Sequence, residues 1–213
     1  MKQDHYLILM IVLLSVFNTF ISSAQIKKEK LKFGFAYGYG TENTFPFNSK
    51  DYDHTTTYYK IKINYLLKDK RKWSYEVNIE PSFNIANHQL INKHFIKPSD
   101  GENFLEQREL FTQKREIKEY VLDLGLLIRY KIIKNYSVYT LASVGPMISN
   151  KATERLAKGF AFSDILAFGT SYTIDNIQLD IQYSIRHTSN FDFTAPNHGH
   201  NTANFEFGVL FKL

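Results

Sequence analysis

IQLDIQYSIRHTS, residues 177–189, alternates apolar and polar side chains at almost every position. Successive side chains of a β-strand point to opposite faces, so this stretch predicts a strand with one apolar and one polar face. The apolar face carries Ile177, Leu179, Ile181, Tyr183 and Ile185, and the polar face carries Gln178, Asp180, Gln182, Ser184 and Arg186. The apolar row ends in His187 and Ser189, so reactive side chains stand beside an apolar surface, which favours an apolar substrate.

The same period of two recurs along most of the chain. Clear examples are residues 33–40, 59–65, 73–84, 122–130 and 201–213, while 137–148 and 160–173 look extended but have faces that are harder to assign. Pro81 cannot donate a ladder hydrogen bond, so we expect a bulge or an early end to pairing there. With 177–189 the pattern predicts eight strands, several of them longer than the five or six residues that are usual in globular proteins.

The predicted connections alternate in length. Short turns are expected near 68–72, 133–136 and 174–176, and long loops near 41–55, 85–116, 149–159 and 190–200. This alternation is typical of outer-membrane barrels, and aromatic residues near the strand ends suit the two membrane interfaces. The sequence therefore predicts an all-β fold, an eight-stranded antiparallel transmembrane β-barrel of the bacterial outer membrane. The alternative is a soluble, lipocalin-like barrel with its apolar row turned inward, which alternation alone does not exclude.

Residues 1–24 have the pattern of a secretory signal peptide. Lys2 precedes an apolar run over residues 6–17, and Ser22-Ser23-Ala24 supplies the small residues of a cleavage site. An uncleaved anchor is the alternative, but polar residues interrupt the run, and a membrane-spanning helix needs about 20 largely apolar residues. We expect cleavage after Ala24, which leaves residues 25–213 as a single barrel domain with extracellular loops.

Charge and cysteine content narrow the possible partners. The chain has no cysteine, which excludes disulfides and thiol-based metal sites. The net charge of +5 suits an anionic membrane or a phosphorylated lipid, and export makes nucleic acid the weaker choice. The narrow interior of an eight-stranded barrel is filled by side chains, so a diffusion pore is not expected. Charged residues of the polar rows are expected to pair there, namely Glu76, Glu80, Asp123, Arg129, Asp180, Arg186 and Glu206.

His187 and Ser189 have the spacing that serine ester hydrolysis requires. The serine needs a base within reach, a group that orients the base, and donors for the oxyanion. Two residues on one strand face are about 7 Å apart at the backbone, a gap that an imidazole can bridge. With both termini in the periplasm, residues 187–190 lie near the extracellular rim. Asn201, which opens the last strand on the same outward surface, can hold the imidazole through its carbonyl oxygen.

These residues also form a motif, which runs His187-Thr188-Ser189-Asn190 and then Pro196-Asn197-x-Gly199-x-Asn201. The motif resembles the signature of the lipid A 3-O-deacylase family, the PagL-type acyloxyacyl hydrolases. The resemblance implies an eight-stranded barrel with a His-Ser-Glu triad on its outer wall. It makes His187 the general base and Ser189 the nucleophile, and it assigns Asn190 and Asn197 to oxyanion or substrate binding. The chain departs from the family twice, with Asn201 at the position of the glutamate and Asp192 at the position of a glycine.

Two functions follow as hypotheses. The first is an outer-membrane serine esterase, a hydrolase that removes an ester-linked acyl chain from lipid A, the lipopolysaccharide anchor in the outer leaflet, without a cofactor. The second is a non-catalytic barrel of the same ancestry with a structural, adhesion or lipid-binding role. A metal site formed by His187, His198, His200 and Asp192 is a further alternative. Imidazoles two apart on a loop are more often solvated, so no metal is expected there.

Overall fold

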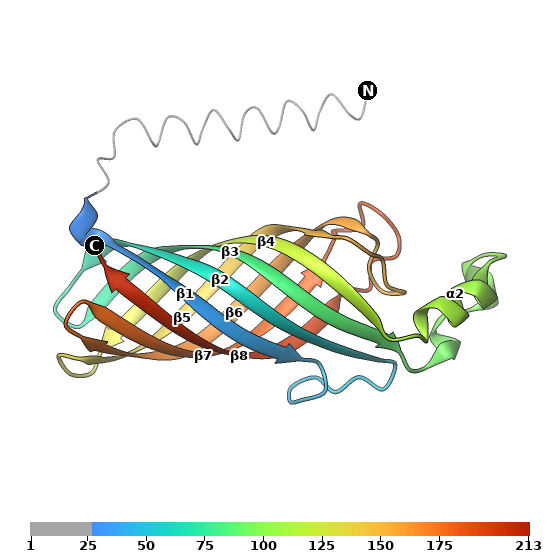
Figure 1. The fold of residues 1–213 in the computed structure, drawn as a ribbon, viewed down its shortest axis with the longest axis horizontal. Coiled ribbons are helices and arrows are strands. Elements are labelled where there is room, and N and C mark those ends of the chain that lie inside the picture. The colour runs from blue at the N-terminus through green and yellow to red at the C-terminus, as the bar shows by residue number, and fades with distance from the viewer. Residues whose placement is uncertain (1–26) are drawn as a thin grey trace, which may run out of the picture.

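The structure, a computed structural model, describes residues 27–213, and the predicted signal segment 1–24 lies outside the described residues. Eight antiparallel strands close into a ring in chain order, as Figure 1 shows. The strands are β1 (Leu31–Thr41), β2 (Tyr52–Asp69), β3 (Trp73–Leu90), β4 (Arg115–Lys131), β5 (Tyr136–Ser149), β6 (Gly159–Ile174), β7 (Ile177–Ser189) and β8 (His200–Lys212). The eight-stranded antiparallel barrel predicted from the alternation is confirmed.

Side-chain burial decides which face of the strands points inward. On β7 the polar residues Gln182 and Asp180 are each 1% exposed, whereas Ile181 and Tyr183 are 47% and 44% exposed. The other strands add to the same outer wall, with exposed side chains that include Phe35, Tyr59, Leu124, Val144, Phe168 and Phe205. An apolar wall around a polar interior is the arrangement of a membrane barrel, and it excludes the lipocalin-like alternative.

Ion pairs fill much of the interior. Lys62 Nζ lies 2.7 Å from a Glu206 oxygen and 3.4 Å from a Glu80 oxygen, and Lys60 Nζ contacts the same two carboxylates at 3.1 and 3.0 Å. Further pairs are Lys32–Glu76, Arg129–Glu76 and Arg186–Glu119. The predicted pairing is therefore confirmed for most inward charges. Asp123 and Asp180 form no ion pair among the described residues, and Asp180 instead accepts a hydrogen bond from the Gln178 amide at 2.8 Å.

The prediction for Pro81 was wrong. β3 continues nine residues beyond the proline to Leu90. The β2–β3 ladder keeps one register on both sides, with Lys60 opposite Ser82 and Ile63 opposite Ile79, and the bulge lies between Leu66 and Lys68 instead. The missing proline N–H therefore removes pairing only locally, because the strand is held on its other side by β4, where Pro81 lies opposite Leu122.

Two loops are shorter than predicted because β2 begins earlier and β3 ends later, which leaves connections of residues 42–51 and 91–114. The added part of β3 presents Asn87 and Gln89 outward, so the apolar alternation that marks a strand in lipid is missing there. The 91–114 loop contains η2 (Lys93–Phe95), η3 (Pro98–Asp100) and α2 (Phe104–Phe111). No helix among the described residues is long and apolar enough to cross a membrane.

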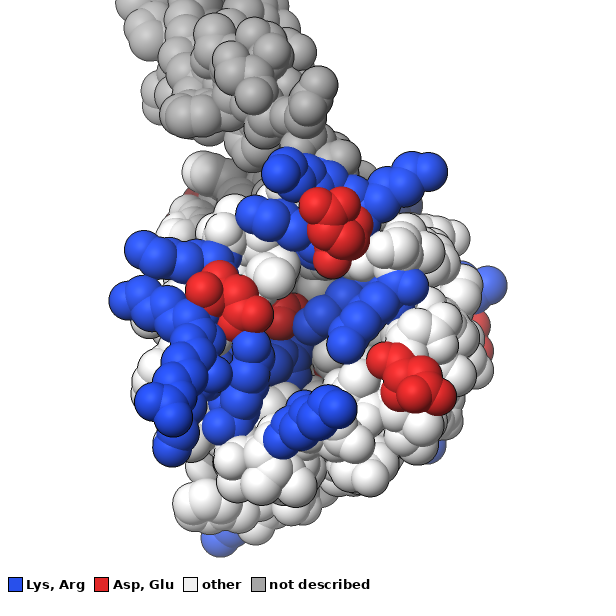
Figure 2. All heavy atoms as spheres, turned by 90° about the vertical axis from the view of Figure 1, so that its left-hand side faces the viewer, with Lys and Arg blue, Asp and Glu red and all other residues white. Residues whose placement is uncertain are grey.

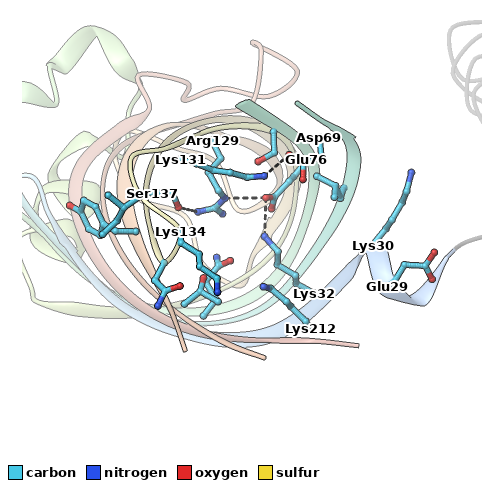
Figure 3. Close-up of a pocket in the computed structure, with 17 residues that line it drawn as sticks. Glu29, Lys30, Lys32, Asp69, Glu76, Arg129, Lys131, Lys134, Ser137 and Lys212 are labelled. Atoms are coloured by element: carbon cyan, nitrogen blue, oxygen red, sulfur yellow. Dashed lines mark hydrogen bonds and ion pairs between the residues drawn. The ribbon is translucent and has the colours of Figure 1, made fainter. Parts of the chain in front are cut away.

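The two ends of the barrel differ. The start of β1, the C-terminus and the short turns lie at the left-hand end in Figure 1, and the long loops and α2 lie at the other end. Figure 2 shows lysine and arginine side chains around the end that carries the short turns. A cavity of about 280 Å³ opens there and is closed toward the interior by the Glu76–Arg129 pair (Figure 3). Basic side chains around this end of a membrane barrel suit the anionic head groups of phospholipids.

Candidate active site

His187 and Asn201 stand opposite each other on β7 and β8 at the long-loop end of the outer wall. The imidazole Nδ1 lies 2.8 Å from Asn201 Oδ1. Since an amide oxygen only accepts hydrogen bonds, Nδ1 carries the proton in this pair and Nε2 keeps a lone pair. The asparagine thus selects the tautomer that a general base needs.

Ser189 follows His187 on the same outward row and is partly exposed, directly opposite Phe162 of β6. Within residues 27–213, no hydrogen bond joins its hydroxyl to His187. The imidazole rests instead beside Gly199, where a Cβ would lie 3.0 Å from His187 Cε1 and 2.6 Å from the Thr188 carbonyl oxygen. Catalytic hydrogen bonds often form only when substrate binds, so His187 and Ser189 can still act together in a reaction. Glycine at 199 gives the imidazole room to turn toward Ser189.

The loop between β7 and β8 brings the two asparagines of the motif together. Asn197 Oδ1 accepts the backbone N–H of Asn190 at 2.7 Å, and the Asn190 side chain donates to the Thr194 carbonyl at 2.7 Å. Asn197 Nδ2 donates to Asp192 Oδ1 at 2.9 Å. These bonds fold the loop immediately after Ser189 and leave one amide N–H of Asn197 available to a ligand.

Asp192 occupies the position at which the sequence motif has glycine, and its backbone explains how it fits. Its φ is +60°, in the left-handed region that glycine adopts freely and that aspartate tolerates better than most residues. The turn is therefore kept. The substitution adds a carboxylate beside Asn197, where negative charge opposes the formation of an oxyanion.

The sequence reasoning missed Asp164. The outward row of β6 is apolar at Phe162 and Leu166, and Asp164 between them is the register partner of His187. Side chains directly opposite on antiparallel strands are close enough to interact. His187 is thus flanked by Asn201 on one side and a carboxylate on the other. The sequence does show Asp164 as the one acid among the apolar even-numbered residues of this strand. It could not be placed on the outer wall, because the sequence left the two faces of residues 160–173 unassigned.

Two apolar surfaces flank the His187–Ser189 pair. The first is a groove of about 320 Å³ lined by Phe47, Asp164, Leu166, Ile185, His187 and Asn201, among others. The loop 42–51 closes its side and is held to the wall by a 2.9 Å bond from Tyr183 Oη to the Phe45 carbonyl. The second is a cluster of aromatic rings around Ser189, formed by Phe160, Phe162, Phe191 and Phe193. Each surface offers hydrocarbon contacts to an acyl chain.

His198 and His200 do not converge on His187. His198 packs edge-on against Phe95, with ring centroids 5.1 Å apart, whereas His200 is buried inside the barrel. Among the described residues, the metal arrangement of His187, His198, His200 and Asp192 is therefore not assembled.

A polar-filled ring of eight strands with an apolar outer wall defines an outer-membrane β-barrel, and a histidine and a serine stand on that wall. A family model described as lipid A 3-O-deacylase (PagL) matches residues 31–209. The chain belongs to this family.

Solved structures agree on the fold. The crystal structure of the outer membrane enzyme PagL has a TM-score of 0.54 and 9% identity, over 85% of this chain and 99% of that one. Neisserial surface protein A has a TM-score of 0.50 and 11% identity, over 86% of this chain and 97% of that one. Identities this low show the fold alone. Among curated proteins, none matches the chain significantly.

Proposed function

We propose that this chain is an outer-membrane serine esterase that removes an ester-linked acyl chain from lipid A. The observation that carries the proposal is the 2.8 Å bond between His187 Nδ1 and Asn201 Oδ1 on the lipid-facing wall, in the same outward row as Ser189. Family membership supports lipid A as the substrate class. The flanking groove and aromatic cluster support a substrate with hydrocarbon chains.

In this mechanism Ser189 Oγ attacks the acyl carbonyl carbon while His187 Nε2 accepts the hydroxyl proton. The resulting oxyanion accepts a hydrogen bond from the free amide N–H of Asn197. His187 then passes its proton to the alkoxide oxygen of the leaving sugar, and the acyl chain stays on Ser189. A water molecule, deprotonated by His187, attacks this ester and releases the fatty acid with Ser189 restored.

The imidazolium formed in each step needs negative charge, which Asn201 does not carry. We propose that Asp164 provides it from the neighbouring strand. Asp164→Asn is expected to lower the rate of acyl release about ten- to a hundredfold, or about 1.4–2.7 kcal/mol in the barrier. Asn201→Glu is expected to raise the rate of the parent chain and to restore that of the Asp164→Asn variant. Initial rates of fatty-acid release from lipopolysaccharide in detergent measure both effects, and an unchanged rate in Asp164→Asn would remove Asp164 from the mechanism.

Asp192 offers a second, independent change. Asp192→Gly keeps the left-handed turn and removes the carboxylate that binds Asn197, so the rate of acyl release is expected to rise about tenfold. Asp192→Asn distinguishes the effect of the negative charge from the effect of a changed turn, since it keeps a polar side chain of the same size without the charge. A rise in both variants supports repulsion of the oxyanion, and a loss of activity in both would show that Asp192 is needed to hold Asn197.

The function itself is tested by incubating the refolded full chain with lipopolysaccharide in detergent micelles and identifying the released acid by mass spectrometry. Release of one acyl species, absent with His187→Ala, is expected. The second candidate is a non-catalytic lipid-binding barrel, which the amide in place of an acid at Asn201 favours. If neither the folded parent chain nor its Asn201→Glu variant releases any acyl chain, this candidate replaces the esterase.

A further inference from the structure

Three histidines meet inside the long-loop end of the barrel, on the opposite side of the wall from His187. His54 of β2, His88 of β3 and His200 of β8 are at most 4% exposed. One ring nitrogen from each lies within 4.8 Å of the others. Three imidazoles in contact at a buried site repel one another if they are protonated. In their neutral forms the three rings offer nitrogen lone pairs to a ligand.

Hydrogen bonds at the back of two rings decide which nitrogens face the centre. His88 Nε2 lies 2.9 and 3.0 Å from the oxygens of Glu154, and His200 Nε2 lies 2.9 Å from Thr153 Oγ1. A carboxylate accepts, so the His88 proton is on Nε2 and its Nδ1 keeps a lone pair. This is the carboxylate–histidine arrangement that orients imidazoles at metal centres.

One of the nitrogens that face the centre lacks a partner. His54 Nδ1 and His88 Nδ1 are 3.2 Å apart and share one hydrogen bond, whereas the buried His200 Nδ1 has no hydrogen-bond partner among the described residues. A buried unpaired nitrogen is unfavourable, so a bound group would satisfy it. Nitrogen ligands of a tetrahedral zinc ion, bonded at about 2.0–2.1 Å, are about 3.3 Å apart. The His54–His88 separation of 3.2 Å is close to this value, and the three nitrogens together lie within 4.8 Å of one another.

We propose that His54, His88 and His200 bind one divalent transition-metal ion of the Zn²⁺ type inside the extracellular mouth of the barrel. Three neutral imidazoles suit Zn²⁺ better than Mg²⁺ or Ca²⁺, which prefer oxygen ligands. The rings of His54 and His200 stack within 8° of parallel, so one of them turns about its side-chain bonds when both bind the ion. Glu42, fully buried and joined through its N–H to the His54 carbonyl, adds a carboxylate oxygen without a partner near this centre.

The ion has a structural role in this arrangement. It joins three strands, and Glu154 links it to the loop between β5 and β6. The β5–β6 loop supports the loop between β7 and β8. Arg155 Nε donates to the Gly199 carbonyl at 2.8 Å, and the Arg155 carbonyl accepts the N–H of His198 at 2.7 Å. His200 itself precedes Asn201. Metal binding therefore fixes the segment that carries Asn197 and Asn201, independently of whether the wall site hydrolyses esters.

Metal binding is measured on the folded full chain after chelator treatment, with Zn²⁺ alone as the probe and Co²⁺ as a spectroscopic substitute. We expect one Zn²⁺ per chain, a higher unfolding temperature with Zn²⁺, and the visible absorption of tetrahedral Co²⁺. His88→Ala and His200→Ala are expected to lose at least about nine-tenths of the bound metal, whereas His198→Ala, which removes a histidine two residues before His200 and outside the cluster, keeps it.

Failure of a histidine variant to fold does not leave the proposal untested, because the parent chain is decisive alone. Folded parent protein that binds no Zn²⁺ above the background of a chelator-containing sample overturns the site. Binding that survives in folded His88→Ala and His200→Ala but is lost in His198→Ala overturns it as well, since the metal would then lie on the surface.

Discussion

Ser189→Ala is expected to lower the rate of acyl release from lipopolysaccharide at least about a thousandfold, because the variant has no nucleophile for the acyl-enzyme step. The barrel should fold unchanged, since Ser189 is partly exposed on the outer wall and makes no side-chain hydrogen bond among the described residues. Fatty-acid release is followed over time, and folding is checked by the shift in gel mobility between heated and unheated protein.

Ser184→Ala is the matched control. Ser184 lies on the same strand but faces the interior, where its hydroxyl makes only a 3.4 Å contact with the Asn204 amide. We expect this variant to keep its full rate. Equal rates for the parent chain and Ser189→Ala would show that any hydrolysis uses a different group, and equal losses in both serine variants would point to damage to the barrel.

Lys62→Met is expected to destabilise the barrel by about 3–5 kcal/mol, the largest stability effect anticipated for a single interior residue. Lys62 is 1% exposed and bridges Glu206 and Glu80 at 2.7 and 3.4 Å. Methionine has a similar shape but no charge, so two buried carboxylates would share Lys60 alone. The free energy of unfolding in urea, with folded and unfolded forms resolved on unheated gels, measures the loss.

The same substitution at an exposed pair provides the control. Lys131 contacts Asp69 at 2.6 Å, but the two side chains are 38% and 47% exposed, so Lys131→Met is expected to cost less than about 1 kcal/mol. Adding Glu206→Gln to Lys62→Met should recover part of the lost stability because one unpaired carboxylate is removed. Equal effects of Lys62→Met and Lys131→Met would mean that the interior network contributes little.

The fold was predictable because lipid outside and ion pairs inside impose a strict period of two on the strands. Strand residues outside the lipid are not under this constraint, so the alternation no longer identifies them as strand. The stretch of β3 beyond Ile85 presents the polar residues Asn87 and Gln89 outward, and it was predicted as a loop. The expected break at Pro81 did not occur, because a strand paired with a neighbour on each side tolerates one missing N–H donor.

The candidate site was predictable as far as contacts follow from register on a known face. His187 and Ser189 share the outward row of β7, and the β7–β8 pairing places Asn201 opposite His187. Asp164 was missed because it needs the β6–β7 register as well. The cluster of His54, His88 and His200 was beyond reach. His54 and His88 pair in stretches that were predicted as loops, and His200 joins them only when the barrel closes.

The central claim is that Ser189 cleaves an ester of lipid A, and the most direct measurement is mass spectrometry of lipid A from a Gram-negative host. The chain and its Ser189→Ala variant are expressed to equal levels in the outer membrane. Lipid A is expected to lose the mass of one acyl chain only with the intact serine. Unchanged lipid A in both strains, with the folded barrel demonstrated in each, would contradict it.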